Sequence, residues 1–340
     1  LSGRRACIVH IYTQSGLPNT EAFARILIMA DAAERAGARE VYLILAQNIF
    51  DRQDIDPRER EHEEYKSFSP GRKRKIEVMQ GQSFSLDVAA KHFQRAGIKK
   101  ILTLDTHSRA SDVRYEKRFH SPDAFSSLDP TLIFAHYMEN LGLEIGDKGS
   151  NLVLVAPDKN ARSIVDSFYE LSGFENAARV YCNKYRAKPN DPSKVEAAVE
   201  ETSDNYNGID GRIVIAMDDM GDTLGTLEKT VVSGLMEQGR PKQIHALLTH
   251  LILSRQSGYE LIARNKLNVH GSNSHANMAF KKDQPGTDQI SVLDFTPYFA
   301  WALTEHLTNG TAIPRFGIED LSKAADLYEI AKKGRIIDFS

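Results

Sequence analysis

The stretch that decides the fold is residues 211–226, GRIVIAMDDMGDTLGT. Its apolar, β-branched residues predict a buried strand, and two adjacent acids, Asp218 and Asp219, follow that strand directly. A turn containing glycine and threonine comes next, and helical spacing then predicts a helix over residues 226–238. In an open α/β sheet, ligands bind beyond the carboxyl ends of the strands, so this turn is a candidate binding site.

The residue types in this turn suit a sugar phosphate. Asp218 and Asp219 can each accept hydrogen bonds from the hydroxyl groups of a vicinal diol. The turn offers backbone N–H groups to a phosphate at a helix N-terminus, and Gly225 lets the backbone approach a ligand closely. A diol together with a phosphate indicates a ribose 5-phosphate moiety. In the alternative interpretation Asp222 and Thr223 only cap the helix, which leaves the paired acids unexplained.

The rest of the chain repeats the same alternation of short apolar runs and amphipathic segments, which predicts βαβ units and parallel sheets. Parallel strands are buried on both faces, and this explains why the apolar runs are continuous. Strands are predicted over residues 6–12, 40–45, 100–104, 151–156, 178–182, 212–217 and 243–248. Helices are predicted over residues 20–36, with Thr20 as the N-cap, and over 86–96, 161–171 and 226–238.

Length and composition exclude several classes of protein. A chain of 340 residues is long enough for two domains. The net charge of −3 argues against nucleic-acid binding driven by bulk charge, and no apolar run reaches the roughly 20 residues of a membrane helix. Two cysteines, Cys7 and Cys182, exclude a disulfide framework and suit a reducing, cytoplasmic compartment. Because the sequence opens with Leu1 and not with methionine, we expect a preceding segment to be missing.

Two further expectations concern local structure. Residues 51–75 are dense in charge and contain two prolines, which predicts a solvated, mobile loop; the alternative is a lid or a subunit contact. We expect Cys7 and Cys182 to be buried within strands. Residues 320–332 are amphipathic, which predicts a packing helix or a subunit contact.

The motifs together resemble one family. Residues 218–226, DDMGDTLGT, resemble the phosphoribosyl-pyrophosphate (PRPP) motif of type I phosphoribosyltransferases, which ribose-phosphate pyrophosphokinases (PRPP synthetases) share. The first half of the chain favours the synthetases, because a transferase alone would lack it. The segment FDRQD at 50–54 is similar to the synthetase "YARQD", LTLDTH at 102–107 to "LTVDLH", and VLVAPD at 153–158 to "VVSPD". Residues 11–38 resemble the early synthetase segment, NKYRAKPN at 183–190 the catalytic loop, and ALLTHLILS at 246–254 "ATHGVLS".

The resemblance implies an enzyme that moves the β,γ-pyrophosphoryl group of ATP to the C1 hydroxyl of ribose 5-phosphate, with AMP and PRPP as products. Such a transfer depends on positioning and on neutralising the charge of phosphate oxygens, here with Mg²⁺. The residues that would hold ribose 5-phosphate are Asp218, Asp219, Asp222, Thr223, Gly225 and Thr226. Arg52, Gln53 and His107 would contact ATP, His107 and Asp158 would hold the metal, and Lys184, Arg186 and His107 would be catalytic.

Each of these assignments has a structural alternative. A histidine after a strand is often only a hydrogen-bonding residue, and Asp158 could cap the helix that follows it. Lys184 and Arg186 could belong to a solvated basic loop. Asp158 is the better direct ligand for Mg²⁺, which prefers oxygen, so His107 would act partly on phosphate.

The sequence departs from the family on its ATP side. Residues 159–162, KNAR, stand where the family has small residues including two glycines. Residues 108–112, SRASD, replace a stretch containing glutamine and glycine, the charged segment 51–75 is longer than usual, and the family's acidic "SDGE" segment is absent. These departures leave a weakly active or regulatory paralogue open as an alternative. A phosphoribosyltransferase that consumes PRPP is a further alternative, which the synthetase-like first half disfavours.

The resemblance also implies the architecture. We expect an α/β protein with two similar domains of phosphoribosyltransferase type, each with a mainly parallel sheet flanked by helices. The predicted domains are residues 1–128 on the ATP side and 129–300 on the ribose 5-phosphate side, with a helical tail at 301–340 packing back on the first domain. A homo-oligomer, a dimer or a hexamer, is expected, with no nucleic-acid or membrane partner.

Overall fold

The computed structural model describes residues 1–13, 18–186, 195–276 and 283–309. Within these residues the chain divides into two compact units. The first unit holds residues 1–11, 18–128 and 305–309, and the second holds residues 12–13 and 129–304. None of the described helices is both long enough and apolar enough to cross a membrane.

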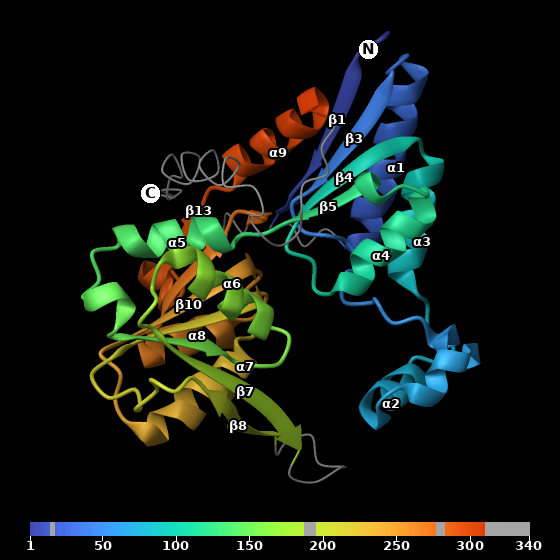
Figure 1. Cartoon of the computed structure of the whole chain (residues 1–340). Coiled ribbons are helices and arrows are strands. Elements are labelled where there is room, and N and C mark those ends of the chain that lie inside the picture. The colour runs from blue at the N-terminus through green and yellow to red at the C-terminus, as the bar shows by residue number, and fades with distance from the viewer. Residues whose placement is uncertain (14–17, 187–194, 277–282, 310–340) are drawn as a thin grey trace. The chain divides into compact units, whose positions relative to one another are not determined.

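The first unit is a parallel sheet whose strands lie side by side in chain order. The strands are β1 (Arg5–His10), β3 (Glu40–Leu45), β4 (Ile98–Leu104) and β5 (Phe125–Leu128), and the crossover helices are α1 (Asn19–Arg35), α3 (Ser85–Arg95) and α4 (Arg109–Phe119). Right-handed crossovers that all advance in one direction place their helices on one face of the sheet, as Figure 1 shows for α1, α3 and α4. The short helix η3 (Pro122–Ala124) leads into β5.

Two predictions for the start of the chain are wrong. Strand β1 is an edge strand, because it pairs with β3 alone among the described strands. Its outer positions therefore face solvent: Val9 is 55% exposed and Cys7 is exposed, whereas Cys182 is buried as expected. Thr20 does not cap α1, since the helix begins one residue earlier, at Asn19, and follows Pro18.

The charged segment is helical and not an irregular loop. It forms the short helices η1 (Pro57–Glu61) and η2 (Glu63–Ser67) and then α2 (Pro70–Val78), which lies away from the sheet in Figure 1. Asp56 and Ser69 cap η1 and α2 with side-chain oxygens, and each helix has proline in its first turn. Ile76 is completely buried, so the segment packs as well as being solvated.

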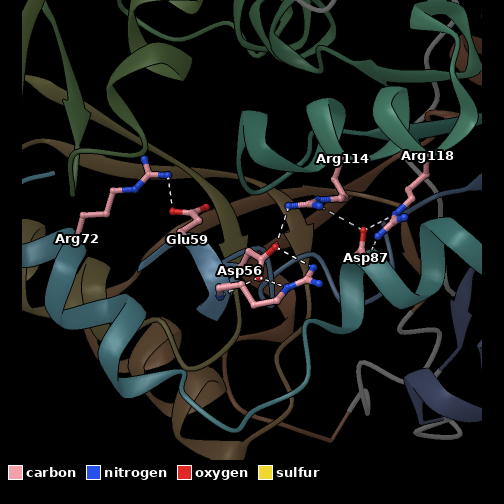
Figure 2. A network of polar contacts seen from close by, with 7 residues as sticks. Asp56, Glu59, Arg72, Asp87, Arg114 and Arg118 are labelled. Carbon is pink, nitrogen blue, oxygen red and sulfur yellow. Dashed lines mark hydrogen bonds and ion pairs between the residues drawn. The ribbon is translucent and has the colours of Figure 1, made fainter. Parts of the chain in front are cut away.

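Ion pairs hold this segment to the rest of the first unit. Asp56 contacts Arg58 and Arg114, and Asp87 contacts Arg114 and Arg118, at distances of 3.4 Å or less (Figure 2). Burial alone would raise the pKa values of Asp56 and Asp87, but their arginine partners lower both below the ordinary range. A buried carboxylate is stable when it is paired in this way.

The second unit is built on a sheet with strand order β13-β11-β10-β9-β6-β7-β8, parallel except where β8 meets β7. The strands are β6 (Leu152–Ala156), β7 (Ala178–Arg186), β8 (Val195–Thr202), β9 (Ile213–Gly221), β10 (Gln243–Leu251), β11 (Asn268–Ser272) and β13 (Ile290–Leu293). The helices are α5 (Thr131–Asn140), α6 (Arg162–Ser172), α7 (Gly225–Leu227), α8 (Gln256–Asn265) and α9 (Thr296–Asn309), with the short turns η4 (Asp147–Gly149) and η7 (Thr287–Gln289). A separate pair joins β2 (Tyr12–Thr13) to β12 (His275–Ala276).

The helix predicted over residues 226–238 is not regular. It consists of α7, a π-helical segment η5 (Glu228–Gly234) and a 3₁₀ turn η6 (Leu235–Gln238). The predicted strand that precedes it is confirmed, with residues 213–217 no more than 1% exposed. It also extends further than predicted, through Asp218 and Asp219 to Gly221.

The sheet of the second unit has a topological switch point between β6 and β9. After β6 the chain moves outward to β7, whereas after β9 it moves the opposite way to β10, β11 and β13. At such a point the two connections leave a crevice at the carboxyl ends of the strands, where α/β proteins bind ligands. Asp158 follows β6, and Asp218 and Asp219 lie near the end of β9.

Candidate functional site

Three carboxylates converge at the switch point. In the ladder between β6 and β9, Val155 lies opposite Ala216, and Asp158 follows the end of β6 close enough for its charge to act on Asp218. Asp219 is 9% exposed, and its N–H donates to Asp218 Oδ1 at 3.0 Å. Burial raises the pKa of Asp218 well above its ordinary value, and the negative charges of Asp219 and Asp158 raise it further. The site therefore favours a ligand that donates hydrogen bonds or carries positive charge.

The turn after β9 is hydrogen-bonded to the segment that follows the neighbouring strand β10. Asp222 Oδ1 accepts hydrogen bonds from the N–H of Ser254, at 3.1 Å, and from its hydroxyl. The α7 helix has no side-chain cap at its start, where Leu224 adopts the left-handed conformation with φ of 56°. The alternative role of Asp222 as a helix cap is therefore wrong. Thr223 Oγ1 accepts from the N–H of Gly225 at 3.4 Å, a local contact within the turn.

Asp158 has two roles in the structure. Its Oδ1 accepts from the N–H of Asn160 at 3.0 Å and from that of Ala161 at 3.4 Å, so it caps the turn before α6, whereas the predicted cap of the helix itself is wrong because α6 has no side-chain cap. Its charge also acts on Asp218 across the switch point. The capping role and a ligand-binding role are compatible, because a carboxylate has two oxygens and about four acceptor positions.

The residues that depart from the family after Asp158 form ion pairs with β8. Lys159 contacts Glu200 at 3.4 Å, and Arg162 contacts Glu201 at 2.7 Å. Arg162 also lies over the ring of Tyr181 on β7, 4.2 Å from its centre. These contacts join the Asp158 turn to the β7–β8 hairpin.

Lys184 and Arg186 lie on the backbone of β7, opposite Ala197 and Val195 of β8. The predicted loop at 183–190 is thus a strand in its first half. The side chains of Lys184 and Arg186, and residues 187–194 between the two strands, lie outside the described residues. Their catalytic role stays a prediction.

The predicted ATP-contacting residues of the first unit are brought together. Arg52 and Gln53 are exposed and follow β3, while His107 lies in the turn after the neighbouring strand β4. Between them, the N–H of His107 donates to Asp51 Oδ2 at 2.6 Å. Ser108 Oγ donates to Asp54, so a second contact joins the same two segments.

No group of three or more histidine, cysteine or acidic side chains among the described residues is arranged to hold a metal ion by itself. Mg²⁺ commonly binds through one or two carboxylates together with waters and substrate phosphates. The oxygen donors of Asp158 and its acidic neighbours fit that kind of binding. His107 lies in the first unit and Asp158 in the second.

Asp51 and Ser254 have structural roles that the sequence does not predict. Both stand inside segments that resemble the family, FDRQD and ALLTHLILS, so their positions were visible. Their partners were not, because His107 lies 56 residues from Asp51 and Ser254 lies 32 residues from Asp222.

The chain is similar in sequence to proteins named ribose-phosphate pyrophosphokinase. A ribose-phosphate pyrophosphokinase from Halalkalibacterium halodurans is 27% identical over 254 residues, which cover 74% of this chain and 65% of that protein. One from Bacillus caldolyticus is 26% identical over 301 residues, covering 87% of this chain and 78% of that protein. The chain thus spans about two thirds of the length of the first relative and 78% of the second, and no family model matches it.

The fold agrees with this likeness. The crystal structure of phosphoribosylpyrophosphate synthetase from Mycobacterium smegmatis superposes with a TM-score of 0.65, at 19% identity, over 91% of this chain and 84% of that one. The α/β fold class of phosphoribosyltransferase type is confirmed, and both sheets are mainly parallel as predicted, with one antiparallel pair, β7 and β8, among the described strands of the second. The resemblance to ribose-phosphate pyrophosphokinases is confirmed in sequence by the relatives.

Proposed function

We propose that this chain transfers the β,γ-pyrophosphoryl group of ATP to the C1 hydroxyl of ribose 5-phosphate, giving AMP and PRPP. The observation that carries the proposal is the acidic switch point, where Asp158, Asp218 and Asp219 meet beside the turn that Ser254 holds. Hydroxyl donors would relieve the like-charge repulsion there. Similarity to proteins named ribose-phosphate pyrophosphokinase supports the choice of substrate.

On this proposal, ribose 5-phosphate lies across the carboxyl end of β9. Asp218 and Asp219 accept hydrogen bonds from its ring hydroxyls. Its phosphate is held by the backbone and hydroxyl groups of the turn, to which Asp222, Thr223, Gly225 and Thr226 belong. The contacts of Asp222 with Ser254 support this, since they hold the turn in shape before a ligand arrives.

ATP is assigned to the first unit. Arg52 and Gln53 contact the nucleotide together with His107, and Lys184 and Arg186 stabilise negative charge on the transferred group. Mg²⁺, held by Asp158 and His107 together with phosphate oxygens, would neutralise charge on those oxygens. The oxygen donors at the switch point support Asp158 as the protein's main ligand.

The two units correspond in this proposal to two functional domains, residues 1–128 and 129–300. The tail at 301–340 is proposed to pack back on the first domain. Its described part supports this, because residues 305–309 group with the first unit and the ring of His306 lies 5.8 Å from that of Tyr42.

A homo-oligomer, a dimer or a hexamer, located in the cytoplasm is also proposed. The resemblance supports the oligomer, and the free thiols of Cys7 and Cys182 suit a reducing compartment. Light scattering of the purified protein at several concentrations tests the oligomer. A monomeric mass throughout would refute it.

One assay separates the possible functions. Purified protein is incubated with ATP, Mg²⁺ and ribose 5-phosphate, and AMP and PRPP are measured. Production of both in equal amounts is expected. Ribose 5-phosphate binding without AMP formation indicates the regulatory paralogue, and consumption of added PRPP in the presence of a nucleobase indicates a transferase.

A variant tests the assignment of the cation. Lys184→Ala should lower kcat by about 10² to 10³ and leave the affinity for ribose 5-phosphate within twofold, because the lysine acts on the transferring group. Lys75→Ala, which removes an exposed lysine of α2, is the matched control and should change neither. An unchanged kcat in Lys184→Ala removes that lysine from the mechanism.

A further inference from the structure

Asp51 is a buried acid that the proposed mechanism does not use. It lies between β3 and the exposed pair Arg52 and Gln53, and it is 4% exposed. We propose that Asp51 is a positioning residue, which holds the turn carrying His107 against the segment carrying Arg52 and Gln53 so that both face one nucleotide. This inference rests on the proposed function, in which these residues contact ATP.

Three donors converge on the Asp51 carboxyl group. The N–H of His107 donates to Oδ2 at 2.6 Å, and Ser111 Oγ donates to Oδ1, also at 2.6 Å. Asn48 Nδ2 donates to Oδ1 at 2.8 Å. The donors come from the turn after β4, from the first turn of α4 and from the turn after β3. One carboxylate therefore connects the carboxyl ends of two neighbouring strands and the start of a helix.

The surroundings fix the carboxylate itself. Tyr115, fully buried on α4, donates from its hydroxyl to Asn48 Oδ1 at 2.9 Å, so Asn48 is oriented to donate to Asp51. Asp51 also lies at the N-terminal end of α4, where the helix dipole favours a negative charge. Asn48 and Tyr115, both buried, thus help to fix where the carboxyl oxygens lie.

The turn that Asp51 holds has an unusual backbone. Asp105 has φ of 37°, in the left-handed region that residues with a side chain rarely adopt. The N–H of Thr106 donates to Ser127 Oγ at 2.9 Å, and the next N–H, that of His107, is the one that Asp51 accepts. Neighbouring contacts therefore keep the turn in a conformation that it would not prefer alone.

In residues 51–53, the residue proposed to hold the turn is buried and the residues proposed to bind ATP are exposed. Asp51 is buried, whereas Arg52 and Gln53 on its carboxyl side are exposed. The similar synthetase segment, "YARQD", has alanine at the position of Asp51. An alanine cannot accept any of the three donors, so the tie between the two segments belongs to this chain's own sequence.

Binding measurements test the proposal on the complete protein. Calorimetry with Mg²⁺–ATP and, separately, with ribose 5-phosphate is carried out on Asp51→Ala and Asp51→Asn. Asp51→Ala should weaken ATP binding about 10- to 100-fold, because misplacing a contact by about 1 Å costs this much, and should leave ribose 5-phosphate binding within twofold. Asp51→Asn should fall between, since one of its two terminal groups is a donor and meets another donor.

Asp87→Asn is the matched control, because Asp87 is also a buried acid of the first unit, paired with Arg114 and Arg118 and making no contact with His107. It should lower the melting temperature without changing ATP affinity. If Asp87→Asn weakens ATP binding as much as Asp51→Asn does, Asp51 acts through stability alone and the proposal is overturned.

Amide hydrogen exchange gives a readout that needs no activity. The peptide containing residues 105–111 should exchange faster in Asp51→Asn than in the unmodified protein, at a folded fraction shown to be equal by circular dichroism. Unchanged exchange overturns the proposal, as does an unchanged affinity for ATP. If the unmodified protein binds ribose 5-phosphate but not ATP, the proposed function itself fails, and the positioning role falls with it.

Discussion

Two sets of acids, one in each unit, have opposite surroundings although both units are built on α/β sheets. In the first unit, Asp56 and Asp87 meet arginines, which lower their pKa values below the ordinary range despite burial. In the second unit, Asp218 meets two further acids, Asp219 and Asp158, and its pKa is raised. The first set stabilises the fold, whereas the second set is, on the proposed function, arranged for a ligand. Ligand-binding sites are often places where the charged groups of the protein are least well paired in the absence of the ligand.

The topology explains why the contrast falls where it does. The first sheet has its strands in chain order, so its connections all pass to the same side. The second reverses direction between β6 and β9, and its acids stand at that reversal. A switch point leaves room for a ligand at the carboxyl ends of its strands.

The largest expected effect is a loss of stability of the second unit in acid. His245 and His270 are buried, with 2.9 Å between Nδ1 of the first and Nε2 of the second, and Tyr137 and Gln243 complete the chain of contacts. Burial lowers the pKa of His245 to about 4 and, with the nearby His245, that of His270 to about 3. Between pH 6.5 and these values the two histidines are protonated in the unfolded chain but neutral in the folded chain. The free energy of unfolding therefore falls as the pH falls.

At pH 5 the two histidines should together cost about 4 kcal/mol relative to pH 7.5. The raised pKa of Asp218 acts in the opposite direction and offsets part of this loss. Hydrogen exchange at both pH values, corrected for intrinsic rates, should show the loss in β10 and β11 before β3 and β4. The exposed His62, changed to glutamine, is the control and should leave the pH dependence as it is. An equal loss of stability at pH 5 in both units would contradict this difference between them.

The next effect concerns the paired acids of the first unit. Asp87→Ala removes the common partner of Arg114 and Arg118, whose side chains are 18% and 34% exposed. Leaving these charges half-buried and unpaired with Asp87 should cost about 2 kcal/mol, less than for a fully buried pair because solvent reaches them. Urea unfolding measures the change. Asp31→Ala, which breaks an exposed pair with Arg35 on α1, should change stability by less than about 0.5 kcal/mol.

A third effect lies in mild alkali and concerns Lys100. This lysine of β4 is 1% exposed and donates to the carbonyl oxygen of Asp123 at 2.6 Å and to Ser126 Oγ at 2.9 Å. Burial lowers its pKa to about 8. Between pH 8 and 10.5 the unfolded chain keeps a proton that the folded chain has lost, so the first unit should gain about 1.5 kcal/mol by pH 9. Lys100→Met should remove this gain, which unfolding curves at pH 7.5 and 9 would detect.

The sequence predicts the interior strands well because both of their faces are buried. An uninterrupted apolar run such as residues 213–216 then has one simple interpretation, and β9 follows it. The paired acids, Asp218 and Asp219, could likewise be recognised as a candidate site, because they follow an apolar strand directly in the sequence. Motif order added the fold class, which no single segment could supply.

Edges and long-range partners are beyond the reach of the same reasoning. Val9 is apolar and exposed because β1 has a neighbour on one side only, which depends on strand order. Residues 195–202, VEAAVEET, have no alternating pattern typical of a strand, yet β8 pairs with β7 through the backbone. The roles of Asp51 and Ser254 depend on contacts 56 and 32 residues away. Such contacts depend on tertiary structure, which local propensity does not encode.

The smallest effect on stability is also the sharpest test of the contrast between the acids of the two units. Removing the charge of Asp218 should stabilise the protein, whereas removing that of Asp87 should destabilise it. Asp218→Asn removes a negative charge from beside Asp219 and Asp158, so it should stabilise the protein without ligand by about 1 kcal/mol at pH 7.5. The gain should shrink as the pH falls through the raised pKa of Asp218, and it should vanish near pH 3.8, where the aspartate is neutral in the unfolded chain as well. Asp210→Asn, at an exposed acid that accepts from the N–H of Arg240, is the control and should give no gain.

Ribose 5-phosphate should then reverse the order of the two proteins. A saturating concentration raises the melting temperature of the unmodified protein by mass action, but it should raise that of Asp218→Asn much less, because the amide carries no charge and accepts at only one atom. Thermal melts without the sugar phosphate therefore measure how much Asp218 destabilises the free protein. Melts with the sugar phosphate measure how much the same residue contributes to binding. If Asp218→Asn destabilises the protein as Asp87→Ala does, the acids of the second unit are structural, and the contrast between the two units disappears.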